Sequence, residues 1–140
     1  MRTALHQALI LCLVALILAV ATALLHPKRP AWTQEQLGEW ELTAEDVSRW
    51  VDHPLWVDAR PAASFQKEHV PGAVPLNEDE WDELLPAVLS AWKADQSIVV
   101  YCDSAECDAS HAVARRLREA GVGPVYVLHG GWVAWKAAPK

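Results

Sequence analysis

Short runs of β-branched and aromatic residues alternate with amphipathic segments through the chain from about residue 40 onward. The runs predict five strands, at residues 40–42, 55–57, 73–76, 98–101 and 125–128. The intervening and following segments predict helices at residues 44–50, 62–68, 77–92, 109–118 and 132–136. Thr43 and Asp46 suit a loose capping box at the start of the first helix, and Gly130 with Gly131 suits a tight turn before the last. This alternation favours an α/β fold, with a five-stranded, mostly parallel sheet covered by helices on both faces.

The first 30 residues have a different pattern. Residues 8–25 contain no charged side chain, and a helix of that length, at about 1.5 Å per residue, is long enough to cross a bilayer. We therefore expect one transmembrane helix and a proline-punctuated linker in residues 1–30, followed by a single domain in residues 31–140. The alternative is a cleaved signal peptide, with a basic start at residues 1–7 and a small-residue cleavage site at residues 21–23.

Both interpretations favour a domain outside a bacterial cytoplasmic membrane. We expect a single-pass protein whose domain faces the periplasm or exterior, although nearly balanced flanking charges leave the opposite orientation open. The first 30 residues hold three of the 12 basic side chains and none of the 18 acidic ones, so the remainder has a formal charge of −9. Such a charge argues against nucleic acid as a partner.

The candidate chemistry lies where the strand at residues 98–101 ends. Cys102 follows this strand, a short acidic loop leads to Cys107, and a helix comes next. Parallel sheets usually hold ligands at the carboxyl ends of their strands, and a helix start favours a thiolate. Only two cysteines lie outside the apolar segment, which excludes a disulfide framework and leaves open a single reactive pair.

Four short stretches occur together in a particular order and spacing. They are residues 57–60 (VDAR), 69–73 (HVPGA), 99–102 (VVYC) and 128–132 (LHGGW). In this combination they resemble the rhodanese-like domain, over about residues 43–137. The resemblance implies a rhodanese-like fold and a nucleophilic Cys102. This cysteine would take sulfane sulfur from a small donor, hold it as a persulfide and pass it to a thiol acceptor, small or protein.

The same resemblance assigns the surroundings of Cys102. Asp58 and Arg60 would lie near the rim of the site, and the backbone N–H groups of the loop after Cys102 would cradle the outer sulfur. The loop residues concerned are Asp103, Ser104, Ala105, Glu106, Asp108, Ala109 and Ser110. No metal and no organic cofactor is implied.

The loop departs from the usual rhodanese pattern, Cys-x-x-Gly-x-Arg-Ser. It is two residues longer, and Ala109 stands where the arginine would be. The loop carries three carboxylates, Asp103, Glu106 and Asp108. A carboxylate about 6 Å from a single negative charge costs on the order of 0.7 to 3 kcal/mol. We therefore expect thiosulfate, a dianion, to be a poor donor.

Several interpretations stay open at this stage. Cys107 is a resolving partner for Cys102, a helper in sulfur transfer, or a plain helix residue. A zinc site made of Cys102, Cys107 and His111 lacks a fourth ligand. Two rival functions are a thiol–disulfide redox module using both cysteines and a non-catalytic binding domain. The arginines of the following helix are expected to form a solvated face; they are Arg115, Arg116 and Arg118.

Overall fold

The computed structural model describes residues 6–7, 10–16, 37–50, 52–105 and 107–138. The chain divides into two compact units, Met1–Gln36 and Leu37–Lys140. In the first unit, residues 10–16 are helical and exposed. Within the described residues, no helix combines the length and the apolar character that a membrane crossing requires. More than half of the predicted transmembrane segment, residues 8–25, lies outside those residues.

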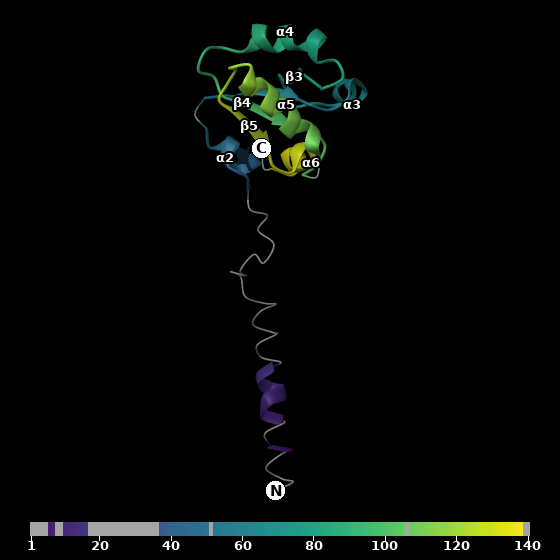
Figure 1. The fold of residues 1–140 in the computed structure, drawn as a ribbon. Helices are drawn as coiled ribbons and strands as arrows, with labels where there is room; N and C mark the ends of the chain where they lie inside the picture. The colour runs from purple at the N-terminus through teal and green to yellow at the C-terminus, as the bar shows by residue number, and fades with distance from the viewer. Residues whose placement is uncertain (1–5, 8–9, 17–36, 51, 106, 139–140) are drawn as a thin grey trace. The chain divides into compact units, whose positions relative to one another are not determined.

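The second unit alternates strands and helices as predicted (Figure 1). Its strands are β1 (Glu41–Leu42), β2 (Leu55–Asp58), β3 (Val74–Pro75), β4 (Ile98–Tyr101) and β5 (Val125–Leu128). Its helices are α2 (Ala44–Ser48), α3 (Ala62–Lys67), α4 (Trp81–Ala91), α5 (Asp108–Glu119) and α6 (Gly131–Ala137). The strands form one five-stranded sheet in the order β1-β5-β4-β2-β3, and the pairings are all parallel. The predicted α/β fold with a parallel sheet is confirmed.

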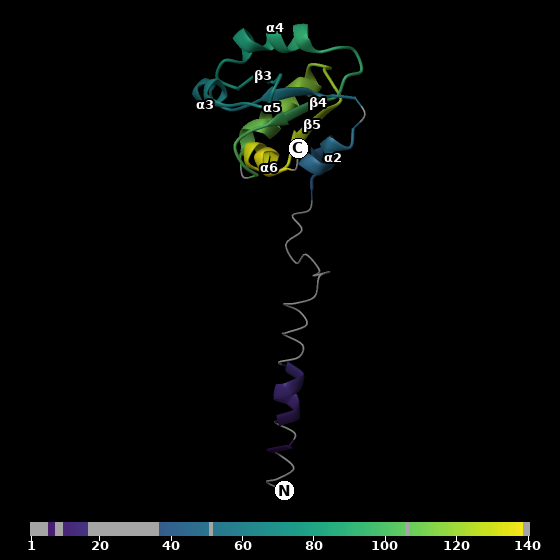
Figure 2. The ribbon, with the colours of Figure 1, turned by 180° about the vertical axis from the view of Figure 1, so that it is seen from behind.

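Helices cover both faces of the sheet. On one face, apolar side chains of β2, β4 and β5 pack against α4 and α5, with Val88 and Leu117 fully buried. On the other face, Val99 and Tyr101 of β4 pack against α2 and α6. Figures 1 and 2 show α4 on one side of the sheet and α2 with α6 on the other. This arrangement explains why β4 reads as an unbroken apolar run: it is buried on both sides.

Local side-chain bonds set the helix starts. Thr43 and Asp46 form the capping box expected from the sequence, with each side chain accepting a hydrogen bond from the other residue's backbone N–H. The helix predicted at residues 77–92 begins later, at Trp81. Asn77 accepts a hydrogen bond from the backbone N–H of Glu80 and donates one to its carboxylate, so these residues form a turn ahead of α4.

The arginines of α5 are not simply a solvated face. The Arg116 guanidinium lies 3.9 Å from the centre of the Trp81 ring, and that of Arg118 lies 5.0 Å from the centre of the Trp40 ring. Arg118 also donates to the carbonyl of Val125 at 3.0 Å. Two of the three arginines therefore fasten α5 to its neighbours through cation–π contacts.

Candidate functional site

Cys102 directly follows β4, the middle strand of the sheet, at the sheet's carboxyl edge. Its residue surface is 1% exposed. Asp58 ends the neighbouring strand β2 at the same edge, in register with Tyr101. The parallel order thus brings the segments around Cys102 and Asp58 to the same edge of the sheet.

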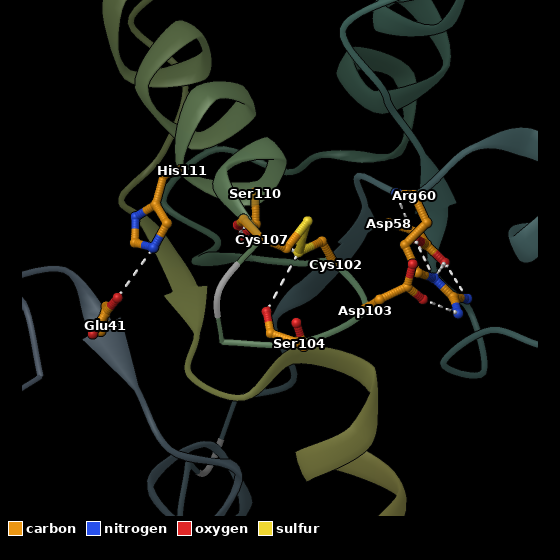
Figure 3. Close-up of a disulfide and its surroundings, with 9 residues drawn as sticks. All are labelled: Glu41, Asp58, Arg60, Cys102, Asp103, Ser104, Cys107, Ser110 and His111. Atoms are coloured by element: carbon orange, nitrogen blue, oxygen red, sulfur yellow. Dashed lines mark hydrogen bonds and ion pairs between the residues drawn. A yellow bond between two sulfur atoms is a disulfide. The ribbon is translucent and has the colours of Figure 1, made fainter. Parts of the chain in front are cut away.

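Cys102 and Cys107 form a disulfide across the loop, with their Cα atoms 6.3 Å apart (Figure 3). Cys107 directly precedes α5 and has an extended backbone. Three roles were left open for Cys107, and in the structure it is the disulfide partner of Cys102. The two residues differ in burial, because Cys102 is buried whereas Cys107 is half-buried. Cys107 is therefore the more accessible half of the pair.

Oxygen atoms surround the sulfur of Cys102. Its Sγ lies 3.6 Å from the Ser104 carbonyl oxygen and 3.4 Å from the Cys107 carbonyl oxygen. The buried hydroxyl of Ser110 lies 3.7 Å from the same sulfur and 3.4 Å from the Cys107 carbonyl. Ser110 is thus placed to donate a hydrogen bond to the sulfur, and the two carbonyls are placed to accept one from a reduced thiol.

The start of α6 holds the strand side of this loop. Trp132 donates its backbone N–H to the Cys102 carbonyl at 2.7 Å, and Val133 donates to the Asp103 carbonyl at 3.3 Å. The turn before these donors uses left-handed glycines, Gly130 at φ 73° and Gly131 at φ 54°. A Cβ atom on Gly131 would collide with the Cys102 carbonyl oxygen. Cys102 is therefore fixed by its strand on one side and by α6 on the other.

Asp58 and Arg60 form a buried ion pair that contacts the loop through Asp103. Arg60 Nε lies 2.9 Å from Asp58 Oδ1, and its Nη2 lies 2.8 Å from Asp58 Oδ2. The Tyr101 hydroxyl donates to Asp58 Oδ2 at 2.6 Å, and Arg60 donates to the Glu68 carbonyl. Arg60 also reaches the loop, where its Nη1 lies 3.4 Å from the Asp103 carboxylate. Arg60 thus connects this network to the Cys102 loop, whereas Asp58 is fully buried.

The environment favours the charged form of Arg60 and the neutral form of Tyr101. Burial by itself lowers the pKa of the Arg60 guanidinium, but the hydrogen bonds and charge of Asp58 outweigh it, so the pKa lies above its ordinary value. Burial and the hydrogen bond to Asp58 raise the pKa of the Tyr101 hydroxyl. Arg60 also lies 4.8 Å from the centre of the Trp132 ring. The Arg60 guanidinium thus already pairs with Asp58 and stacks on the Tyr101 and Trp132 rings. Little of its positive charge is left to attract an anionic substrate.

The described part of the loop is acidic at its surface. Asp103 and Asp108 are exposed, Ser104, Ala105 and Ala109 are half-buried, and Ser110 is buried. Glu106, the third predicted carboxylate, lies outside the described residues. Ala109 offers no cation, and the guanidinium bonded to the described loop residues is that of Arg60. Cys102 thus lacks, within these residues, the loop arginine of the usual pattern.

His111 does not join the cysteines. Its Nε2 lies 3.1 Å from Glu41 Oε1, and the other carboxylate oxygen of Glu41 lies 3.6 Å from Nδ1 of His129. Figure 3 shows the His111 ring directed towards Glu41 and away from the disulfide. Among the described residues, no group of three or more His, Cys, Asp and Glu side chains is arranged to hold a metal ion. His111 instead ties α5 to β1.

Two contributors to the site were not predicted. Tyr101 was assigned only to a strand, yet its hydroxyl donates to Asp58 and accepts from the backbone N–H of Val70 at 3.1 Å. The signal was available, because a tyrosine in a fully buried strand needs a hydrogen-bond partner for its hydroxyl. The Gly130–Gly131 turn was predicted, but its contact with the Cys102 carbonyl was not. Nothing in the local sequence indicates which distant segment a tight turn will touch.

Comparisons with solved structures find the same fold. A Bacillus halodurans protein has 22% identity and a TM-score of 0.59, covering 70% of this chain and 72% of its own. A rhodanese-like domain protein from Staphylococcus aureus has 18% identity and a TM-score of 0.54, covering 68% of this chain and 89% of its own. The rhodanese-like domain of an Anabaena protein has 26% identity and a TM-score of 0.55, covering 71% of this chain and 75% of its own.

The family comparison extends over more than half of the chain. The model of the rhodanese-like domain matches residues 43–138, which include every strand but β1 and every helix from α2 to α6. The matched segment also contains both cysteines of the disulfide and the Asp58–Arg60 pair. The chain therefore belongs to the rhodanese-like domain family.

Proposed function

We propose that this protein is a sulfurtransferase in which Cys102 takes up sulfane sulfur as a persulfide and passes it to a thiol acceptor. The observation that carries the proposal is the position of the Cys102 sulfur. It lies at the carboxyl edge of a parallel sheet, beside the buried Ser110 hydroxyl and in reach of a second cysteine. The family supports the same assignment.

The reaction begins with both cysteines reduced, because the nucleophile is the Cys102 thiolate and a disulfide contains no thiolate. The Cys102 thiolate attacks the outer sulfur of a donor of the form RS–SH. A new S–S bond forms at Cys102, the donor S–S bond breaks, and RS⁻ leaves. An acceptor thiolate then attacks the outer sulfur, and the Cys102 thiolate leaves. The Ser110 hydroxyl, 3.7 Å from Sγ, stabilises that leaving thiolate by donating a hydrogen bond.

The proposed donors carry little negative charge. Asp103 and Asp108 are exposed at the mouth of the loop, and the charge of Arg60 is engaged by Asp58. A dianion such as thiosulfate is repelled by these carboxylates, whereas a persulfide of a small thiol is repelled less. We therefore propose persulfides as the donor class and disfavour thiosulfate.

The proposal is tested on the full chain carrying Cys12→Ala, so that Cys102 and Cys107 are its two thiols. The protein is reduced, the reductant is removed, and cysteine persulfide, a donor of lower negative charge than thiosulfate, is added before intact-mass measurement. We expect Cys107→Ser to gain the mass of one sulfur atom, removable by reductant. Cys102→Ser should gain none by comparison. If Cys107→Ser stays unmodified while its far-UV circular dichroism matches the parent, the sulfurtransferase proposal is wrong.

A second candidate function is thiol–disulfide exchange, and the disulfide between Cys102 and Cys107 favours it. In this case the pair would exchange electrons with a partner dithiol without handling sulfane sulfur. Both cysteines would then be required, whereas persulfide formation requires Cys102 alone. The comparison of the two single variants separates the two functions.

We also propose that residues 8–25 anchor the protein in the bacterial cytoplasmic membrane, with the domain in the periplasm or exterior. The absence of charge along these residues supports the anchor. A disulfide in the domain is compatible with an oxidising compartment. The partners proposed are the small sulfur donor, a thiol acceptor and the membrane itself.

A further inference from the structure

The disulfide limits what Cys102 can carry. Its Sγ is bonded to Cys107, and a sulfur in this state holds one S–S bond at a time. The Cys107 sulfur therefore takes the place on Cys102 Sγ that the outer sulfur of a persulfide would take. Persulfide and disulfide are alternative occupants of one bonding position, and an exchange between them is a single displacement at Cys102 Sγ.

We infer that Cys107 resolves a Cys102 persulfide that has met no acceptor thiol, so that the protein then releases this sulfur as hydrogen sulfide. This inference rests on the proposed sulfurtransferase function. The Cys107 thiolate attacks the inner sulfur, Cys102 Sγ. The Cys102–Cys107 bond forms, the bond to the outer sulfur breaks, and that sulfur leaves as HS⁻. The outer sulfur is reduced to sulfide, and the two cysteine sulfurs are oxidised to the disulfide.

The geometry selects the inner sulfur as the point of attack. The disulfide shows that the Cys107 sulfur can reach Cys102 Sγ when the Cα atoms of the two residues are 6.3 Å apart. Both ends of the loop are held, because β4 and the start of α6 fix Cys102, and α5 begins directly after Cys107. Attack on the outer sulfur would instead move the persulfide to Cys107 and form no disulfide.

The burial of the two residues defines how the cycle is closed. Cys102 is 1% exposed, so a protein thiol has little access to its sulfur. Cys107 is half-buried, so it is the half of the disulfide that an external dithiol attacks. The dithiol bonds first to Cys107, the Cys102 thiolate leaves, and the second thiol of the reductant completes the exchange as both cysteines become free. The partner class is therefore a protein dithiol that acts after sulfide has left.

The test adds a sulfide measurement to the full-chain Cys12→Ala series. Reduced protein freed of reductant receives one equivalent of cysteine persulfide, and sulfide is measured together with intact mass. The Cys102→Ser/Cys107→Ser double variant supplies the blank. We expect the parent to release about one equivalent of sulfide and to become two hydrogens lighter than its reduced form. Cys107→Ser should retain the sulfur atom and release no sulfide above the blank.

Two outcomes separate this inference from the function on which it rests. If the parent and Cys107→Ser both retain one sulfur atom without releasing sulfide, transfer to Cys102 stands and the resolving role is wrong. A persulfide found on Cys107 by peptide mapping would overturn it as well. If Cys107→Ser and a parallel Cys107→Ala variant both fold but gain no sulfur, the sulfurtransferase function itself fails. Circular dichroism of both variants establishes that they are folded.

Discussion

Among the described glycines, Gly131 leaves the least room for a side chain. Its φ of 54° is in the left-handed region, and an added Cβ would collide with the Cys102 carbonyl oxygen, a backbone atom just after β4 that accepts a hydrogen bond from Trp132. Gly72 has a comparable φ of 81° but nothing within 4 Å of its Cβ position. The two glycines therefore share a backbone cost of about 1–2 kcal/mol on substitution, and only Gly131 adds a steric one.

We predict that Gly131→Ala lowers the free energy of unfolding by more than Gly72→Ala, which should lose about 1–2 kcal/mol. The reason is that the α6 start must move away from Cys102 to relieve the collision. Urea denaturation of both variants measures the difference. In reduced protein, Gly131→Ala should also speed alkylation of Cys102. The Cys102 carbonyl loses its hydrogen bond from Trp132, so Cys102 is held less firmly in its buried position. Equal losses of stability in the two variants would contradict this account of the turn.

Single residues differ in how much of their role the sequence reveals. The position of Cys102 after an apolar strand was predictable, since the strand and the following helix are local patterns. The role of Arg60 was only partly predictable. Its proximity to Asp58 is local, but its contacts with Trp132 and the Asp103 carboxylate depend on segments that meet only in the folded sheet. The same reason explains why the stacking of Arg116 on Trp81 was missed.

At the scale of elements, α2 depends on its capping box. Asp46 accepts hydrogen bonds from the Thr43 hydroxyl and backbone N–H, and these bonds, with a smaller contribution from Arg49, lower the pKa of its carboxyl. The unfolded chain therefore binds a proton to Asp46 more readily than the folded one does. The stabilisation is present above the pKa of an aspartate in the unfolded chain, near 3.8, and is lost as pH falls through the lower pKa of the folded state.

We predict that Thr43→Ala lowers the free energy of unfolding by about 1 kcal/mol at neutral pH. The difference from the parent should shrink as the pH drops below about 4, because protonation of Asp46 weakens the same bonds in the parent. Thermal unfolding at several pH values measures it. Ser48→Ala is the control, since its exposed hydroxyl donates to the Glu45 carbonyl and makes no bond to Asp46. A Thr43→Ala difference that is constant with pH would exclude the Asp46 coupling.

Element types were predictable from periodicity, but element ends were less so. The capping box at α2 is a local pattern of two residues and was predicted correctly. The start of α4 was placed too early because its acidic residues suit a helix start, whereas Asn77 uses its side chain to close a turn with Glu80. The hydrogen bonds from the start of α6 to the carbonyls of Cys102 and Asp103 could not be predicted from the sequence. They join backbone groups, which every residue type carries.

At the scale of the whole molecule, the anchor proposal makes a localisation prediction. Expressed with its first residues intact, the chain should sediment with membranes and resist extraction by alkaline carbonate. Leu13→Arg/Leu16→Arg should weaken this retention, because each arginine near the centre of a spanning helix costs about 2.5–3.5 kcal/mol. Fractionation followed by mass measurement is the test. A soluble chain shortened near residues 21–23 would support the signal peptide, and a soluble chain of full length would contradict both.

The single bonding position on Cys102 Sγ also couples the proposed sulfur loading to the redox potential of the compartment. Under the proposed function, no sulfur can be loaded while Cys107 occupies that position, so the fraction of the protein able to accept sulfur equals its dithiol fraction. For a two-electron couple, that ratio of dithiol to disulfide changes tenfold for about every 30 mV of ambient potential. Throughput of sulfur would therefore follow the electron supply of the compartment, even at constant concentrations of protein and donor.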